Sequence, residues 1–129
     1  MKVYLFVGIG GAIGSILRYL VSIVTLEYFG TGFPYGTLFV NLVGSFVLAW
    51  FTSRIIALNK IAEYLSAAIG TGLIGSFTTL STLSVDVVAL AEKGHLSYVI
   101  IYFLMSILGG LLLAFAGLTL GKNRKMGNT

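Results

Sequence analysis

The sequence predicts an all-α membrane protein with four transmembrane helices. Only 9% of its 129 residues are charged, 57% are hydrophobic, and the mean hydropathy is +1.02, whereas a soluble domain carries about 25% charged residues. Stretches of 26, 22 and 26 residues without a charge lie between positions 27 and 54, 63 and 86, and 95 and 122. Each is long enough to cross a bilayer, which takes roughly 20 residues. This composition argues against a soluble enzyme or a nucleic-acid-binding module, so we expect no enzymatic activity.

Four predicted helices follow one another with short connections between them. The first contains Arg18 as its only charge and is longer than the apolar part of a secretory signal, so we expect it to stay in the mature protein. A turn with the only proline, Pro34, follows it, and a polar turn around Gly94 precedes the last helix. The predicted helices cover residues 3–24, 35–53, 62–90 and 96–121. They form one transmembrane domain, 1–121, and we expect the polar tail, 122–129, to be disordered.

Lysine and arginine are distributed unevenly between the predicted loops, and such a bias sets the orientation of a membrane protein. If the N-terminus is cytoplasmic, that side carries six cations, whereas the opposite side carries only Lys93. We therefore expect a multi-pass protein of the plasma membrane with both termini in the cytoplasm. The six cations are Lys2, Arg54, Lys60, Lys122, Arg124 and Lys125.

Small residues recur at a spacing of four in the first and last predicted helices. This spacing lets helix backbones approach closely in lipid. Packing within one chain would explain any single pair, but four helices are few for enclosing a pathway. We therefore expect these faces to serve mainly the assembly of several chains. The pairs are Gly10 with Gly14, Ser106 with Gly110, and Gly117 with Gly121.

The middle of the third predicted helix combines glycines with hydroxyl side chains. Three glycines lie within six residues from Gly70 to Gly75, and five hydroxyls lie within seven residues from Thr78 to Ser84. Irregular backbone at mid-depth survives only where protein or water satisfies its polar groups. A helix break near Gly75–Thr78 would release carbonyls for a hard cation and amides for an anion. The alternative is an unbroken helix whose Ser and Thr bond back to their own turns.

Two polar side chains lie inside the other predicted helices. Asn41 either bonds to a neighbouring helix, the commoner case, or lines a polar pathway. Arg18 is costly in a bilayer unless it snorkels, pairs or faces water. Because it lies near the outer end of its helix, it would either snorkel or draw anions into a vestibule. The chain has no cysteine, and its single histidine, His95, does not make a metal cluster.

Three motifs follow one another in order: GGAIGSILRY with Arg18, PYGTLFVNLVGSF with Asn41, and GLIGSFTTLSTLS in the third helix. In this order and spacing they resemble the motifs of the Fluc or CrcB family of small four-helix fluoride channels, over nearly the whole chain. The resemblance implies an antiparallel dimer with two pores, which exports fluoride passively from the cytoplasm and so lowers its toxicity. It also implies a structural Na⁺ at the dimer centre, held by the backbone carbonyls of Gly75 and Thr78.

The resemblance also implies an ion pathway. Fluoride holds its water tightly, so a pathway must offer close hydrogen-bond donors without trapping the ion, and amides and hydroxyls meet this need. Arg18 matches a vestibule arginine, Tyr102 an aromatic position beside the pore, and Asp86 a carboxylate near the pore mouth. The positions matched to the pathway are Asn41, Ser81, Thr82, Ser106, Arg18, Thr79, Tyr102, Leu80 and Leu83.

Some positions depart from the family pattern. Leu80 and Leu83 stand where phenylalanines are expected, whose ring edges can meet an anion, and Gly110 replaces an expected hydroxyl. The cation bias is also unexpected, because an antiparallel homodimer needs a chain that inserts both ways. We hypothesise one half of a heterodimer whose oppositely oriented homologue supplies the aromatic residues; the alternative is a homodimer. A small four-helix proton-coupled multidrug exporter and a non-conducting partner subunit stay open as further alternatives. In every case the partners are a lipid bilayer and other chains, with fluoride as the ion of the channel, and not nucleic acid.

Overall fold

The structure is a computed structural model that describes residues 1–123, and every regular element in this range is helical. Four segments are long and apolar enough to cross a membrane, which confirms the four predicted helices. They extend a few residues beyond the predicted ends. The predicted polar tail begins within the last helix, and from residue 124 it lies outside the described residues. The four segments are Lys2–Phe29, Tyr35–Ile56, Glu63–Glu92 and Leu96–Lys122.

Several of these segments are built of more than one helical piece. The first is the single helix α1 (Lys2–Phe29), and the second joins α2 (Tyr35–Phe51) to the π-helical η1 (Thr52–Ile56). The third consists of α3 (Glu63–Ala67), η2 (Ala68–Ile74), α4 (Gly75–Phe77) and α5 (Leu80–Glu92). The fourth consists of α6 (Leu96–Leu104), η3 (Met105–Gly109) and α7 (Gly110–Asn123). Gly30 and Gly94, with φ of 74° and 77°, turn the chain after α1 and α5, as only glycine does readily.

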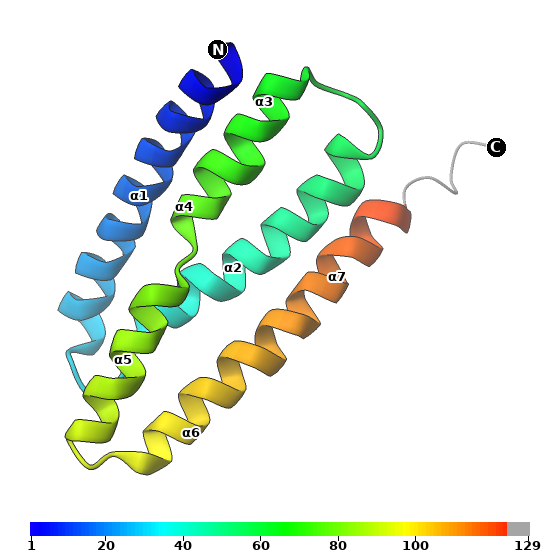
Figure 1. The fold of residues 1–129 in the computed structure, drawn as a ribbon. Coiled ribbons are helices and arrows are strands. Elements are labelled where there is room, and N and C mark those ends of the chain that lie inside the picture. The colour runs from blue at the N-terminus through cyan, green and yellow to red at the C-terminus, as the bar shows by residue number, and fades with distance from the viewer. Residues whose placement is uncertain (124–129) are drawn as a thin grey trace.

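The four segments pack in two pairs (Figure 1). The first half of the third segment lies along α1, whereas α2 lies along α7. Loops at one end of the bundle join α2 to the third segment, and the N-terminus and the end of α7 lie at the same end. The short turn between α5 and α6 lies at the opposite end. Among the described residues, Lys2, Arg54, Lys60 and Lys122 therefore lie at one end of the bundle, and Lys93 lies at the other.

Glycines bring the paired helices into close contact. A Cβ at Gly10 would collide with the carbonyl of Ala68, and a Cβ at Gly14 would collide with that of Leu73. In the other pair, a Cβ at Gly117 or Gly121 would strike α2 or η1. The expectation that these two small-residue pairs serve mainly the assembly of several chains is therefore wrong, because both are used within the chain.

The helical path of the third segment is interrupted between α4 and α5 (Figure 1). Thr78 (φ −81°, ψ 158°) and Thr79 (φ −154°, ψ 125°) have extended backbone, and we call these two residues the extended link. The glycines that precede it are helical. Gly70 and Gly72 belong to η2, and Gly75 begins α4. A Cβ at Gly72 would lie 2.6 Å from the carbonyl oxygen of Val7, so this glycine serves the packing of η2 on α1.

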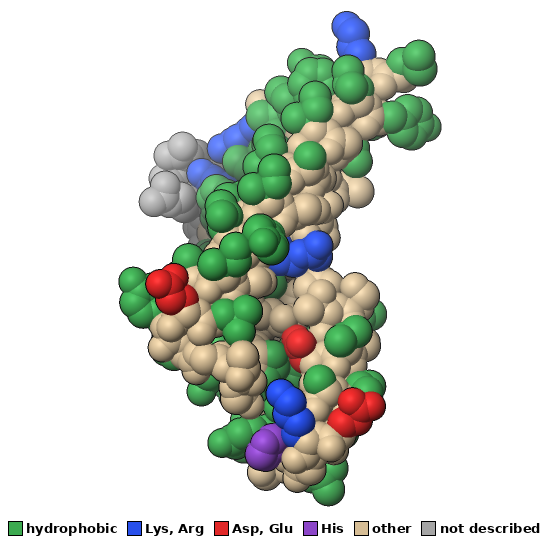
Figure 2. All heavy atoms as spheres, turned by 90° about the vertical axis from the view of Figure 1, so that its left-hand side faces the viewer, with side chains coloured by type: hydrophobic (Ala, Val, Ile, Leu, Met, Phe, Trp, Pro, Cys, Tyr) green, Lys and Arg blue, Asp and Glu red, His purple; other side chains and the backbone are tan. Residues whose placement is uncertain are grey.

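The surface of the bundle is largely apolar along its length. Leu5, Ile16 and Leu20 on α1 are each at least half exposed. Figure 2 shows hydrophobic side chains over much of the face that α1 borders, with Lys or Arg at its top and beside a hollow near its middle. An apolar surface of this extent would aggregate in water, so it is the surface of a protein that faces lipid.

Candidate functional site

Asn41 in α2 pairs with the backbone of the extended link. Its Oδ1 accepts a hydrogen bond from the Thr79 N–H at 2.7 Å, and its Nδ2 donates to the Thr79 carbonyl at 2.8 Å. One side-chain amide thus satisfies both backbone groups of an extended residue, which has no neighbouring strand. Asn41 therefore forms the interhelical hydrogen bond that was one of its two interpretations. The amide carries two N–H groups, and the bond to Thr79 uses one of them.

Thr79 also organises the first turn of α5. It is the N-cap residue, and its Oγ1 accepts from the Thr82 N–H at 3.2 Å, the usual capping arrangement. The same oxygen lies 3.1 Å from Thr82 Oγ1 and 3.2 Å from Ser81 Oγ. Thr79 is buried, whereas Ser81 and Thr82 are exposed. The start of α5 therefore presents two hydroxyls beside a helix N-terminus, where the backbone favours negative charge.

Thr78 is held by contacts on three sides. Its Oγ1 bonds back to the carbonyls of Ile74 and Gly75, both at 3.3 Å, and a Cβ at Gly44 in α2 would collide with its methyl group. Its carbonyl faces Arg18 Nη1 at 3.5 Å. Arg18 is half-buried and reaches across to the extended link, where the Thr78 carbonyl is its polar partner.

Two carbonyls at the link suit a hard cation in their chemistry. In a continuous α-helix the Gly75 carbonyl would accept from the N–H four residues later; here the Thr79 N–H donates to Asn41, and the Gly75 carbonyl accepts from the Thr78 hydroxyl. The Thr78 carbonyl belongs to the extended backbone, and Arg18 is a competitor for it. Gly75 is exposed, so its oxygen lies where a second chain could add ligands. Oxygen donors of this kind fit a hard cation.

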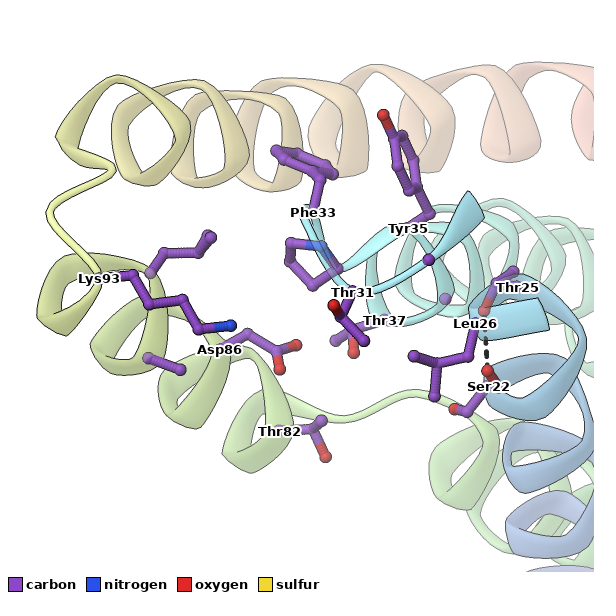
Figure 3. Close-up of a pocket in the computed structure, with 15 residues that line it drawn as sticks. Ser22, Thr25, Leu26, Thr31, Phe33, Tyr35, Thr37, Thr82, Asp86 and Lys93 are labelled. Atoms are coloured by element: carbon purple, nitrogen blue, oxygen red, sulfur yellow. Dashed lines mark hydrogen bonds between the residues drawn. The ribbon is translucent and has the colours of Figure 1, made fainter. Parts of the chain in front are cut away.

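A cavity of about 310 Å³ lies between the end of α1, the turn that follows it and α5. Figure 3 shows the Asp86 carboxylate and the Lys93 ammonium group extending from α5 toward the same space. Thr37 of α2 and Thr82, one turn before Asp86, also line this cavity. The cavity therefore continues from the hydroxyls at the start of α5 toward the end of the bundle that carries Lys93.

Tyr102 joins α6 to this row of polar groups. Its ring is completely buried, and its hydroxyl donates to Asp86 Oδ2 at 3.2 Å. Ser106, one turn further along the same helix face, has a buried Oγ with no hydrogen-bond partner among the described residues. A buried hydroxyl without a partner is unfavourable, so Ser106 has a donor and an acceptor that no described residue uses.

Most of the predicted site residues fall into two clusters, Ser106 lies one turn along the helix from Tyr102 of the second cluster, and Leu80 is an outlier. Arg18, Asn41, Thr79, Ser81 and Thr82 meet at the extended link. Asp86 and Tyr102 meet beside the cavity, and Leu83 packs against the core that contains Tyr102. The outlier, Leu80, is 77% exposed and points away from the rest of its own chain.

Sequence reasoning missed two residues that shape this region. Thr37 is buried and lines the cavity, and Gly44 admits the methyl group of Thr78. Both lie on α2 within one turn of Asn41, at spacings of four and three residues, which places them near its face of the helix. That spacing is the signal that could have identified them.

Comparison with known proteins gives a consistent result. Residues 5–118 match the family described as CrcB-like protein, Camphor Resistance (CrcB). A Bacillus anthracis protein named fluoride-specific ion channel FluC 1 is 43% identical over 119 residues, which cover 92% of this chain and 87% of that protein. A Desulfitobacterium hafniense protein of the same name is 46% identical over 110 residues, 84% of this chain and 94% of that protein. Fluoride-specific ion channel FluC of Allorhizobium ampelinum is 43% identical over 122 residues, 95% and 98% of the two chains.

Proposed function

Because the chain belongs to the CrcB family, we propose that it is a subunit of a fluoride-selective channel in a membrane. The family is one of ion channels, so an enzymatic role is not expected. The observation that carries the proposal is a row of side-chain donors, which begins at the extended link and continues along α5 into the cavity. Asn41, Ser81 and Thr82 would thereby give a small anion partners at successive positions between the extended link and the cavity.

The donors in the row suit fluoride. Asn41 has one N–H left over from its bond to Thr79, and Ser81 and Thr82 offer hydroxyls beside the N-terminus of α5. Ser106 adds a buried hydroxyl without a partner among residues 1–123. Neutral donors replace the water around the ion, and they release it more easily than a fixed cation would. Arg18 also lies at the link, where its positive charge would raise the local concentration of anions.

The pair of Asp86 and Tyr102 would promote the release of fluoride from the pathway. Because Tyr102 donates its only hydroxyl proton to Asp86, it has no proton to give to fluoride. The carboxylate beside the cavity repels an anion. We propose that the pair fixes the wall of the pathway and keeps fluoride from resting at this end, because conduction needs sites that also let the ion leave.

Membership of the CrcB family also supports an antiparallel dimer with a structural Na⁺. Gly75 and Leu80 are exposed on either side of the extended link, which leaves a face that a second subunit would cover. The Gly75 and Thr78 carbonyls of both subunits would hold the ion. Bound there, Na⁺ would link the two chains through shared ligands and would carry no current.

The cation bias supports a fixed orientation and hence a heterodimer. In this proposal both termini are cytoplasmic, fluoride leaves the cytoplasm passively, and an oppositely oriented homologue supplies aromatic residues where this chain has Leu80 and Leu83. Reconstitution of the chain alone, and then with such a homologue, tests this part. Flux only in the mixture supports the heterodimer, whereas full selective flux through the single chain refutes it.

Fluoride efflux from liposomes tests the channel itself. Vesicles that contain the protein and its homologue are loaded with potassium fluoride, and efflux is started with a potassium ionophore and followed with a fluoride electrode. We expect rapid efflux of fluoride, none of chloride, and no change when a proton uncoupler removes any pH gradient. Flux that requires a proton gradient would instead indicate an exporter, and no flux in either preparation would refute the proposal.

A further inference from the structure

A second cavity lies apart from the row of donors, between the second and fourth membrane segments. It has a volume of about 350 Å³ and is lined by Phe46, Trp50, Arg54 and Leu120; we call it the α2–α7 groove. Three of these residues are large and apolar, and the fourth is a cation. None of them belongs to the polar row or the extended link.

The shape of the groove follows from the close packing of its two helices. A Cβ at Gly117 would collide with the carbonyl of Phe46, and a Cβ at Gly121 would collide with the hydroxyl of Ser53. Since the backbones touch at these glycines, the large side chains must lie on either side of the seam. Trp50 is 38% exposed and Leu120 is 56% exposed. They form an apolar part of the α2–α7 groove on the outer surface of a membrane protein, where lipid acyl chains surround the protein.

Arg54 is the charged residue in the lining of this groove. It lies one helical turn after Trp50 and is half-buried. Within residues 1–123 it forms no side-chain hydrogen bond and no ion pair, and no acidic side chain lines the groove. An arginine without an acidic neighbour at the end of a membrane helix is free to bind an anionic headgroup. Its planar fork of N–H groups binds phosphate in two-point fashion.

We propose that the α2–α7 groove binds an anionic phospholipid, with its phosphate on Arg54 and one acyl chain along Phe46, Trp50 and Leu120. The charge of this end of the bundle matches the ligand, because it also carries exposed Lys2, Lys60 and Lys122. Basic pockets between membrane helices are typical sites for anionic headgroups. The proposal needs only that the protein lies in a bilayer and is independent of the ion that it conducts.

Trp50 is the only tryptophan of the chain, so it reports directly on the occupant of the groove. The protein is placed in vesicles of equal parts phosphatidylcholine and phosphatidylglycerol, with bromine on the acyl chains of one lipid or of the other. Bromine quenches tryptophan fluorescence on contact. Because both vesicles have the same composition, the ratio of the two quenching values measures which lipid sits against Trp50.

We expect brominated phosphatidylglycerol to quench more strongly, with a relative binding constant of about fivefold for one arginine–phosphate contact. Arg54→Gln should reduce this preference to about onefold, and Arg54→Lys should retain part of it, which separates loss of charge from misfolding. Lys60→Gln is the matched control, because it removes a cation from the same end but not from the groove. It should leave the preference unchanged.

Three outcomes would overturn the proposal. Equal quenching by the two lipids in the wild type would show that the groove holds no preferred headgroup. A preference that survives Arg54→Gln, or that Lys60→Gln reduces equally, would show a diffuse effect of surface charge. Absence of quenching by either lipid would show that protein, such as a second copy of this chain, covers Trp50.

Discussion

Replacing Asn41 by alanine removes the side chain that pairs with the extended link. Both hydrogen bonds to Thr79 are lost, and Thr79 is only 8% exposed, so bulk water does not readily replace them. Hydrogen bonds between membrane helices contribute about 0.6 kcal/mol each on average, which gives a loss of about 1 kcal/mol. A buried backbone group left without a partner costs about 1–3 kcal/mol, so two such groups raise the loss to about 4 kcal/mol if the link stays dry.

Two measurements on Asn41→Ala check this expectation. Thermal unfolding in detergent should show a lower melting temperature than the wild type, because the extended link loses its two hydrogen bonds to α2. Fluoride efflux from liposomes should also fall, because the proposed pathway loses an N–H donor. Ser45→Ala is the matched control on the same helix. Its hydroxyl bonds only back to the carbonyl of Asn41, at 2.7 Å, so its removal should change stability by less than about 0.5 kcal/mol.

Asn41→Asp separates the two roles of the amide. Aspartate keeps an oxygen for the Thr79 N–H but, when ionised, has no N–H for the Thr79 carbonyl. We expect stability between that of wild type and Asn41→Ala, and the lowest flux of the three, because the carboxylate repels fluoride. Wild-type stability and flux in Asn41→Ala would refute the reasoning. Reduced stability with full flux would leave Asn41 as a support of the link and refute its place in the pathway.

Three further predictions concern the neighbouring groups. Gly44→Ala should destabilise the protein by about 1–3 kcal/mol through overpacking against Thr78, and it should lower fluoride efflux. Gly8→Ala is the control, because a Cβ there meets nothing within 4 Å, and it should change neither quantity. Equal melting temperatures of the two variants would contradict this prediction. Asp86→Asn keeps a partner for the Tyr102 hydroxyl but removes the charge, so the apparent fluoride affinity in flux assays should rise while the maximum flux falls. Replacing sodium by a large organic cation throughout purification should lower the melting temperature of the dimer, and identical melting curves with and without sodium would count against the structural Na⁺.

The membrane segments could be predicted because their signal is local. Uncharged length and the loop residues around Pro34 and Gly94 mark the four helices directly, and all four are present. The prediction ends the first helix at residue 24, whereas α1 continues through Tyr28 and Phe29. Amphipathic aromatic residues sit well at a membrane interface, so a helix can run on past its last aliphatic residue.

The details around the extended link could not be predicted from local pattern. Glycines drew attention to residues 70–75, yet these have helical backbone, and Gly72 serves the close packing of η2 on α1. The extended residues are those whose polar groups Asn41 satisfies, and Asn41 lies 38 residues away from Thr79 in sequence. In the same way, the spacing of Gly117 and Gly121 indicates a close neighbour but does not say whether that neighbour belongs to the same chain.

The candidate site was predicted in part. Asn41, Ser81 and Thr82 were identified from residue type and family resemblance, and they meet at the link. For Arg18 the sequence left two alternatives, snorkelling to the membrane surface or drawing anions into a vestibule, because sequence position indicates the depth of a side chain but not its direction. In the structure Arg18 contacts the Thr78 carbonyl, since the tight packing of α1 on η2 brings the link within its reach.

The pairing of Asn41 with Thr79 also has a consequence for the order in which the segments enter the membrane during synthesis. An extended residue with free N–H and C=O groups costs several kcal/mol in hydrocarbon, so the third segment needs its partner before it can settle in lipid. Because α2 precedes the third segment in the chain, it is synthesised first, and the Asn41 amide is in the membrane before the extended link is inserted. A circular permutant that places the third segment ahead of α2 should therefore insert poorly, although it would encode the same contacts.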